Sequence, residues 1–291
     1  MSKFWYFIII WGLTSTGQLV FSQTNYTTAN NGAWNVAGTW DANGVPPNPL
    51  PNGDSIIVKH IVNYNVSMEV LGVMLVQSGA TIIGDGGSDL DIGKGGIGIG
   101  QLINYGNITV QNLEVKPDNG CTPNNDFPSI HNYKVITTTN KLHIGNNCGA
   151  GAFYNYSEAA VSVANDIHLD NYLYNVSTMS ATVKLKNHGG TVEGCGTIET
   201  PLLDIDVNTG RPGLFGCIDI CNGGSDPTIN IDGADYTNLN DAYTNGPVAE
   251  VTIDDDSTFI CGFNQAGDVN SLPIDNMFAP FYFIKLLIAP I

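Results

Sequence analysis

Short runs of β-branched and other apolar residues alternate with polar residues along most of the chain. The runs lie between Ser55 and Cys261 and are separated by Gly, Asn and Asp. Within most of them the alternation has period two, which places one row of side chains inward and the next toward solvent, as in β-strands. No stretch carries an apolar stripe with helical spacing. The pattern therefore predicts an all-β protein.

The spacing of the runs favours stacked coils. Successive runs begin about 10 to 20 residues apart and share a loose motif of apolar pair, Gly or Asn turn, and apolar pair, which is typical of solenoids. Asn and Gly suit the corners, which need residues that tolerate positive φ, and Asn side chains can hydrogen-bond along a stack. We expect a right-handed parallel β-helix (a β-solenoid) over residues 55–262. The alternative is two β-sandwiches, although one sandwich uses fewer strands than appear here.

Two tryptophans precede the first strand run and predict an N-terminal cap in residues 23–54. A solenoid must cover its open end, because an uncovered core and strand edge would aggregate. Trp34 and Trp40 are six residues apart, which places both on one face of an extended segment. Each ring can bury roughly 150 to 250 Å². The alternative is an exposed aromatic platform that stacks on sugar rings.

The region near residues 117–150 interrupts the repeat. It contains three prolines and the turn-rich sequence CTPNNDFP. We interpret it as an excursion loop bounded by Cys121 and Cys148, carried on the coils and free to vary in sequence. Such a loop is either a binding element or a neutral insertion.

Both ends of the chain carry apolar segments that are not predicted strands. Residues 1–22 have the three parts of a secretory signal peptide: Lys3, the apolar stretch that follows it, and a small residue, Ser22, at the cleavage point. We expect the mature protein to be secreted or displayed on the outer cell surface. Residues 263–291 form an apolar tail that is natural or truncated, and prolines and a lysine interrupt it. No membrane span is expected in the mature chain.

The charge balance excludes nucleic acid as a partner. The chain has 27 acidic and 10 basic residues and a formal net charge of −17. Phosphate binding relies on clustered cations, and the sequence contains no basic stripe. Charged residues make up 13%, so Asn, Thr, Ser and Gly supply much of the polar surface. This composition favours strands and turns.

Six cysteines in an exported chain indicate disulfides. Fifteen pairings are open to six cysteines, and the sequence does not choose among them; neighbourhood suggests Cys121 with Cys148. Free buried thiols are the alternative. A zinc–thiolate site is not expected, because Cys217 and Cys221 have no second pair or His nearby. The six residues are Cys121, Cys148, Cys195, Cys217, Cys221 and Cys261.

Candidate chemistry is sparse. Four tyrosines gather near the middle of the chain and form the predicted binding patch for extracellular glycans or surface proteins; their alternative role is core or corner stacking. The five histidines are interpreted as dispersed single residues. Carboxylate groups such as Asp204 and Asp206 have no cluster of Lys, Arg or His residues near them in the sequence. An acid–base or lyase mechanism would therefore lack a charge-neutralising cation. The tyrosines are Tyr154, Tyr156, Tyr172 and Tyr174, and the histidines are His60, His131, His143, His168 and His188.

Calcium is the cofactor that the sequence suggests, and no other is expected. Asp and Asn oxygens in Gly-rich turns suit this hard cation. Neither acidic group matches a helix–loop–helix or nonapeptide calcium motif, so solvated corner residues are the alternative. The carboxylates concerned are Asp85, Asp89 and Asp91 in the first group and Asp232, Asp235 and Asp241 in the second.

The opening segment resembles the G8-like start of large secreted β-helix proteins common in Bacteroidetes. Trp34, Trp40, the sequence GVP from Gly44, Gly53-Asp54 and the following SIIVKHIVNYNV carry the resemblance, with Gly79 at a later turn. GCGTIET, CIDIC and VTIDDDSTFICG are similar to the terminal coils of such proteins. The resemblance implies a secreted or surface-displayed, adhesin-like β-helix, often a cargo of the type IX system. The C-terminal sorting domain of such cargo is not found before Ile291.

Taken together, the sequence favours a non-enzymatic role in adhesion, extracellular structure or glycan binding. The second hypothesis is a carbohydrate-active enzyme, a polysaccharide lyase or glycoside hydrolase, on the same scaffold. It rests on analogy with other β-helix proteins.

Overall fold

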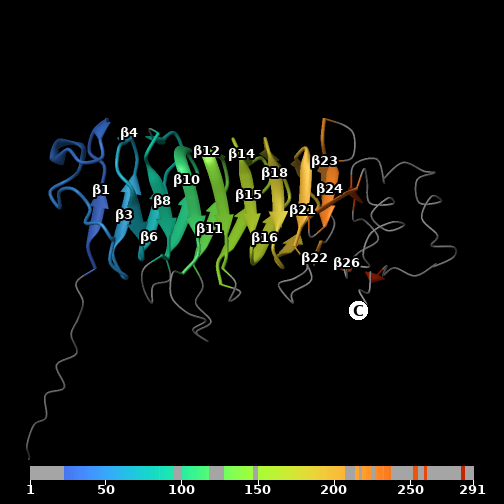
Figure 1. Ribbon diagram of the computed structural model, residues 1–291. Helices are drawn as coiled ribbons and strands as arrows, with labels where there is room; N and C mark the ends of the chain where they lie inside the picture. Colours follow the sequence, from blue (N-terminus) through green and yellow to red (C-terminus); the bar gives the residue numbers. More distant parts are fainter. Residues whose placement is uncertain are drawn as a thin grey trace, which may run out of the picture.

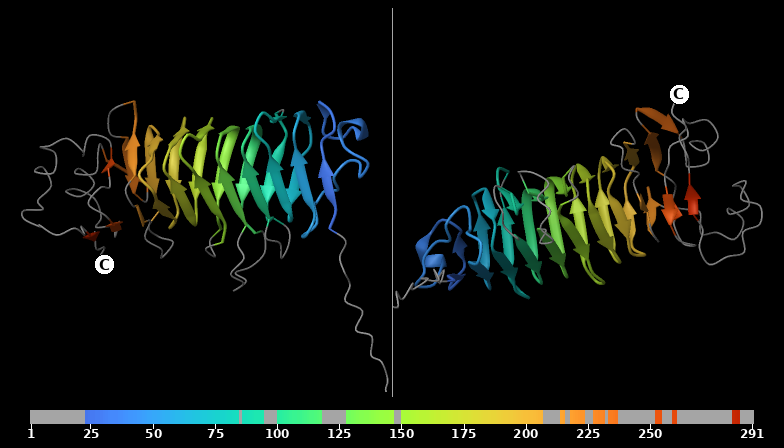
Figure 2. Two further views of the ribbon diagram at one scale, coloured as in Figure 1. Left: turned by 180° about the vertical axis from the view of Figure 1, so that it is seen from behind. Right: turned by 90° about the horizontal axis from the view of Figure 1, so that it is seen from below.

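Parallel β-strands stacked along one axis form an elongated body (Figures 1 and 2). The computed structural model describes residues 23–84, 86–94, 100–117, 128–146 and 150–206, and shorter segments between 214 and 285. Within these residues there is no α-helix, and one 3-10 helix, η1 (Ala37–Thr39), is present. The predicted all-β class is confirmed. The alternative of two β-sandwiches is wrong, because nearly all strand pairs are parallel.

The strands fall into three stacks, which we number in the order in which the chain visits them. The first stack is a single 11-stranded sheet, parallel except for its last pair, β26 and β28. It consists of β1 (Asn25–Thr27), β3 (Ser55–Val58), β6 (Val73–Val76), β9 (Gln101–Asn104), β11 (Ser129–Asn132), β13 (Ala152–Asn155), β16 (Tyr172–Asn175), β19 (Thr191–Glu193), β22 (Leu214–Phe215), β26 (Thr252–Asp254) and β28 (Phe283–Lys285).

The second and third stacks share the two long strands β10 (Asn107–Val115) and β12 (Val135–Ile144). A shift of register after Val110 divides β10 into one half for each stack. The second stack also has β2 (Gly32–Ala33), β4 (Ile61–Tyr64), β7 (Thr81–Gly84), β14 (Ala160–Val163), β17 (Thr178–Ala181), β20 (Thr197–Glu199), β23 (Asp219–Cys221) and β27 (Phe259–Ile260). The third has β5 (Met68–Val70), β8 (Asp89–Ile92), β15 (Asp166–Leu169), β18 (Lys184–Asn187), β21 (Leu202–Ile205) and β24 (Thr228–Ile231), with β25 (Ala234–Tyr236) antiparallel to β24.

The chain passes through the first, second and third stacks in turn and then returns to the first. Each strand pairs in register with its counterpart in the next coil, as β3 does with β6 and β6 with β9. This arrangement of long parallel sheets is compatible with the predicted β-solenoid.

Period-two alternation explains the core. In most strands every second side chain is buried, and the register places these side chains directly above one another. In the second stack, for example, Val62, Ile82 and Ile108 are neighbours in one column, and all three are fully buried. Burial of apolar surface, at roughly 25 cal/mol per Å², is the main source of stability.

The tryptophans cover the first coil. Trp34 and Trp40 are 2% and 4% exposed, so the alternative of an exposed platform is wrong. Their rings meet edge to face with centroids 4.8 Å apart, and Trp34 makes a similar contact with Tyr64 at 5.0 Å. The indole N–H of Trp40 donates to the carbonyl of Trp34 at 2.6 Å. Strands β1 and β2 of this segment pair with β3 and β4, so it covers the core and also extends two stacks.

A buried column of asparagines runs through the corner after the first stack. Asn104, Asn132, Asn155 and Asn175 are fully buried. Each of the first three donates from its side-chain amide to the side-chain oxygen of the next, at 2.8, 2.9 and 2.8 Å. Asn175 donates to the carbonyl of Thr197 at 3.1 Å. The expected hydrogen bonding of Asn side chains along the stack is therefore present.

The expected excursion near 117–150 is smaller than predicted. The range contains β11 and β12, which pair in register with strands of the coils on both sides. Pro117 follows the end of β10 and Pro128 precedes β11, so both lie outside the paired residues and break no strand. Cys121 and Cys148 are outside the described residues.

The terminal segments are described only in part. Residues 1–22 are outside the described residues, and within 263–291 only Phe283–Lys285 is described, as β28. No helix in the described part of the chain is long and apolar enough to cross a membrane.

The asparagine column yields a prediction about stability. Asn132→Ala removes the acceptor of one N–H of the Asn104 amide, whose other N–H still donates to the carbonyl of Val135. It also leaves the side-chain oxygen of Asn155 without its donor. A buried polar group without a partner costs about 1 to 3 kcal/mol, so we expect a loss of about 2 to 4 kcal/mol in the free energy of unfolding. Urea denaturation measures it.

Asn140→Ala is the matched control. Asn140 belongs to a half-buried column, in which it donates to Asn112 at 2.8 Å and accepts from Asn165. Solvent reaches this column, so its loss is expected to stay below about 1 kcal/mol. Equal losses in the two variants would contradict the assigned role of the buried column.

Candidate functional site

A column of charged side chains lies on the outward face of the third stack. Each occupies the middle position between two buried residues of its strand, as Asp91 does between Leu90 and Ile92. Strand pairing therefore aligns these positions from coil to coil. The column contains Glu69, Asp91, Glu114, His143, His168, Lys186 and Asp204.

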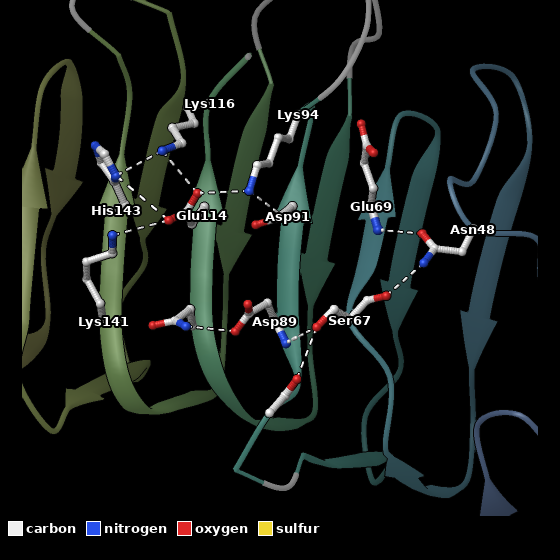
Figure 3. A network of polar contacts seen from close by, with 12 residues as sticks. Asn48, Ser67, Glu69, Asp89, Asp91, Lys94, Glu114, Lys116, Lys141 and His143 are labelled. Atoms are coloured by element: carbon white, nitrogen blue, oxygen red, sulfur yellow. Dashed lines mark hydrogen bonds and ion pairs between the residues drawn. The ribbon is translucent and has the colours of Figure 1, made fainter.

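Glu114 is the centre of an ion-pair network (Figure 3). Its carboxylate is 3.0 Å from Lys116, 3.3 Å from Lys141 and 3.7 Å from Lys94. The residue is 9% exposed. Burial acts to raise the pKa of the carboxyl, but the hydrogen bonds and charges of Lys116 and Lys141 outweigh it and lower the pKa to about 2. Glu114 is therefore firmly ionised.

Asp91, the neighbour of Glu114 in register, shows the opposite shift. Burial raises its pKa, and the ion pair with Lys94 at 3.1 Å reduces this effect without cancelling it. The charge of Glu114 adds to the increase. The two adjacent carboxyl groups thus differ in their affinity for a proton, which is the pattern of acid–base pairs.

Three histidines gather around Asp170, next to this network. His143 and His168 pair directly in register, with rings stacked 4.5 Å apart and 3° from parallel. Asp170 is 3% exposed; its side chain contacts His143 at 2.6 Å and His188 at 3.1 Å. The second nitrogen of His188 contacts Asp206. The interpretation of these histidines as dispersed was wrong, because coils of unequal length bring residues at irregular intervals to equivalent positions.

His168 differs from the other members of the cluster. Its Nε2 atom is buried and has no hydrogen-bond partner, and the nearest carboxylate oxygen, on Asp170, is 3.6 Å away. Burial lowers the pKa of the imidazole to about 4, although the charge of Asp170 acts in the other direction. A neutral imidazole with an unused nitrogen is therefore present on the face of the third stack.

A second cluster consists of aromatic rings on the outward face of the first stack. His131, Tyr154 and Tyr174 are register neighbours. A parallel column follows the buried asparagines: Tyr105 stacks on Tyr133 at 4.6 Å, and Tyr133 stacks on Tyr156 at 4.3 Å.

The two aromatic columns contact each other. His131 stacks on Tyr154 at 4.7 Å, and its Nδ1 is 3.0 Å from the Tyr156 hydroxyl. Tyr172 and Tyr174 are tilted by 53° and 46° from the ring of Tyr154. The four predicted tyrosines are therefore brought together, and the sequence analysis missed Tyr105, Tyr133 and His131 as further members.

The hydroxyls of Tyr156 and Tyr172 stay protonated. Burial and the neighbouring hydroxyl of Tyr133 raise the pKa of Tyr156 to about 12. Burial also raises the pKa of Tyr172, which donates a hydrogen bond to Glu193 at 2.6 Å. At physiological pH these two tyrosines thus present neutral hydroxyl groups.

The predicted calcium ligands have other partners where they are described. Asp89 accepts from Asn112 at 2.7 Å, Asp91 pairs with Lys94, and Asp235 accepts from Asn230 at 2.7 Å. Asp89 and Asp91 share the outward face of β8. The remaining candidates, Asp85, Asp232 and Asp241, lie outside the described residues, and calcium stays a prediction.

Two of the six cysteines are described, and both are disulfide-bonded: Cys195 and Cys221. Cys121, Cys148, Cys217 and Cys261 lie outside the described residues.

Short sequence signals could have located both clusters. The charged column follows a recurring triplet of apolar, charged and apolar residues: MEV, LDI, LEV, LHI and IHL. The aromatic cluster follows the dipeptide Asn-Tyr, which recurs at 104–105, 132–133 and 155–156. Aligning these motifs, rather than seeking a fixed period, places like residues above one another.

Comparisons with protein-family models, with curated proteins and with solved structures found no match for the chain.

The low pKa of Glu114 yields a prediction about pH. A carboxyl whose pKa is lowered by folding, here from 4.5 to about 2, stabilises the protein above pH 4.5, and this contribution is lost as the pH falls toward 2. We expect Glu114→Gln to lower the free energy of unfolding at pH 7 by about 1 to 2 kcal/mol, after allowance for screening by solvent. Urea midpoints from pH 7 to pH 3 measure the change.

The difference between wild type and variant should shrink below pH 4.5, because the carboxyl of the unfolded wild type becomes protonated there whereas that of the folded protein stays ionised until the pH approaches 2. Glu158→Gln, at an exposed position, removes the same charge and should follow the wild type throughout. A difference for Glu114→Gln that is independent of pH would argue against the assigned ionisation.

Proposed function

We propose that the protein is an exported, right-handed parallel β-helix of the outer cell surface that binds an extended extracellular glycan through its aromatic cluster. The leader-like segment at 1–22 and the disulfides support export. The parallel stacks support the β-helix, and the strong preference of parallel crossover connections for one hand supports the right-handed form. The G8-like resemblance adds a surface-displayed, adhesin-like role to the proposal.

The observation that carries the proposal is the alignment of aromatic rings across successive coils. Rings from β11, β13 and β16 and the turns beside them form a row along the axis of the stack. Aromatic side chains with a polar tip suit ligands that are apolar on one face and hydroxylated at the edge. A row of several coils suits a linear polymer better than a single small molecule.

The ring orientations indicate how a glycan would bind. Rings stacked on one another, as Tyr133 is on Tyr156, present edges and hydroxyls to solvent. Tilted rings such as Tyr172 and Tyr174 are not covered in this way. We therefore expect sugar stacking at the tilted pair and hydrogen bonding along the stacked rings. The net charge of −17 disfavours polyanions, so the proposed ligand is neutral or amino-sugar-containing.

Glycan binding can be tested with a Tyr172→Ala, Tyr174→Ala double variant. On an array of neutral and amino-sugar glycans, we expect the wild type to bind at least one linear polymer and the variant to lose at least about 10-fold in affinity, which corresponds to about 1.4 kcal/mol.

An Ile83→Ala, Val183→Ala double variant is the control, because these exposed apolar side chains lie away from the aromatic cluster. It should bind like the wild type. Equal binding by the tyrosine variant, or no binding by the wild type, would refute the proposal.

A second candidate function, a carbohydrate-active enzyme, is favoured by the pair Asp91 and Glu114. The opposite pKa shifts of the two carboxyls would suit a general acid and an ionised partner. Neighbouring strands lie about 4.8 Å apart, near the carboxyl separation of about 5 to 5.5 Å in retaining glycosidases. The competing role of these residues is a structural ion-pair network with the lysines around them.

The enzymatic candidate predicts release of reducing ends from a panel of polysaccharides. Asp91→Asn and Glu114→Gln should each lower kcat by about 10² or more, because each removes one partner of the acid–base pair. Asp204→Asn, in the same column but distant along the stack, should keep full activity. Absence of release by the wild type, or equal rates in all variants, would leave the ion-pair network as the role of these residues.

A further inference from the structure

His143, His168 and Asp170 place three metal-ligating atoms together on neighbouring coils. One nitrogen from each imidazole and one carboxylate oxygen lie within 4.8 Å of one another. The two histidines are held opposite each other by strand pairing between β12 and β15. Asp170 follows directly after β15, where its main-chain N–H donates to the carbonyl of Ile144 at 2.8 Å. The backbone thus fixes all three residues relative to one another.

Hydrogen bonding within the cluster leaves one ligand atom unused. His143 Nε2 is satisfied by Asp170 at 2.6 Å, whereas the buried Nε2 of His168 has no partner. A buried polar atom without a partner is costly and calls for an explanation, such as an ion that is bound there. Imidazole nitrogen and carboxylate oxygen are ligands that zinc and neighbouring transition metals accept, whereas calcium takes six to eight oxygens.

We propose that His143, His168 and Asp170 form a binding site for a divalent transition-metal ion, with zinc as the reference metal. Zinc lies about 2.0 to 2.2 Å from nitrogen and oxygen ligands, so two ligand atoms of one ion are at most about 4.4 Å apart. The present separations of up to 4.8 Å would have to shorten slightly to meet this limit. Three protein ligands leave a coordination position for solvent or a substrate.

Residues around the three ligands fit this role. A lysine ammonium can only donate, so the contact with Lys116 at 3.2 Å makes His143 Nδ1 an acceptor and leaves a hydrogen on Nε2. Metal binding at Nε2 requires the other tautomer. Nδ1–H can then turn to Glu114, whose Oε1 is 4.0 Å away, in the carboxylate–histidine–metal arrangement. His188 holds the carboxylate of Asp170 from the other side at 3.1 Å.

Zinc binding is tested on the untagged full chain after chelator treatment. Isothermal titration with zinc chloride should give one ion per chain, and cobalt(II) should give visible absorption bands of a nitrogen- and oxygen-ligated ion. His168→Gln should weaken zinc binding by about 100-fold or more, because it removes a ligand. Its melting temperature without metal should fall only slightly, because His168 Nε2 has no hydrogen bond to lose and the stacking contact with His143 is the main loss.

Two further variants distinguish zinc binding at this site from zinc binding by histidines elsewhere in the chain. His60→Gln removes a histidine that contacts Thr28 on the first coil, and it should bind zinc like the wild type. Glu114→Gln should weaken binding about 10-fold or more through the orientation of His143. Absence of zinc uptake by the wild type, or equal affinity in His168→Gln and wild type, would overturn the proposal. These measurements use no glycan, so they are independent of the proposed function.

Discussion

The register between successive coils is the constraint on which the rest of the structure depends. Parallel pairing places each residue directly over its counterpart, about 4.8 Å away, so that every side chain has a neighbour from the next coil above and below it. A residue is therefore tolerated only if its side chain can pack against, or hydrogen-bond with, the side chains above and below it in the same column. Apolar columns fill the core, and the buried asparagine column meets the constraint because an amide both donates and accepts.

Columns that face outward obey the same constraint, and this brings charged, imidazole and aromatic side chains next to one another. Like charges are costly to stack, and the third stack does place Glu69, Asp91 and Glu114 one above another. Lysines around Glu114 offset the repulsion, and Asp170 lies among histidines. On the first stack, tyrosines follow one another because flat rings stack at the spacing of the strands. The proposed glycan row and the proposed metal site are thus products of one repeat geometry.

Much of the fold could be predicted from the sequence, because period-two runs such as SIIV mark strands without knowledge of their partners. Burial of Trp34 and Trp40 followed from the need to cover the first coil. The site was harder to predict, since it depends on which coils are neighbours. Eighteen residues separate the paired Ser55 and Val73, whereas 28 separate Val73 and its next partner, Gln101. With unequal coils, no fixed interval brings His143 over His168.

After the first coil, most of the variation in coil length falls at one corner, and this helps to explain how two clusters coexist. Connections from the first to the second stack are short throughout the well-described coils, and those from the second to the third are short or absent, as within β10 and β12. Long connections follow β8, β10, β12 and β21, all at the return from the third stack to the first. Lys94, Lys116 and Asp170 lie at the start of this corner. Insertions there can alter the surroundings of the polar cluster while strand pairing keeps its ligand atoms, and the aromatic row, in register.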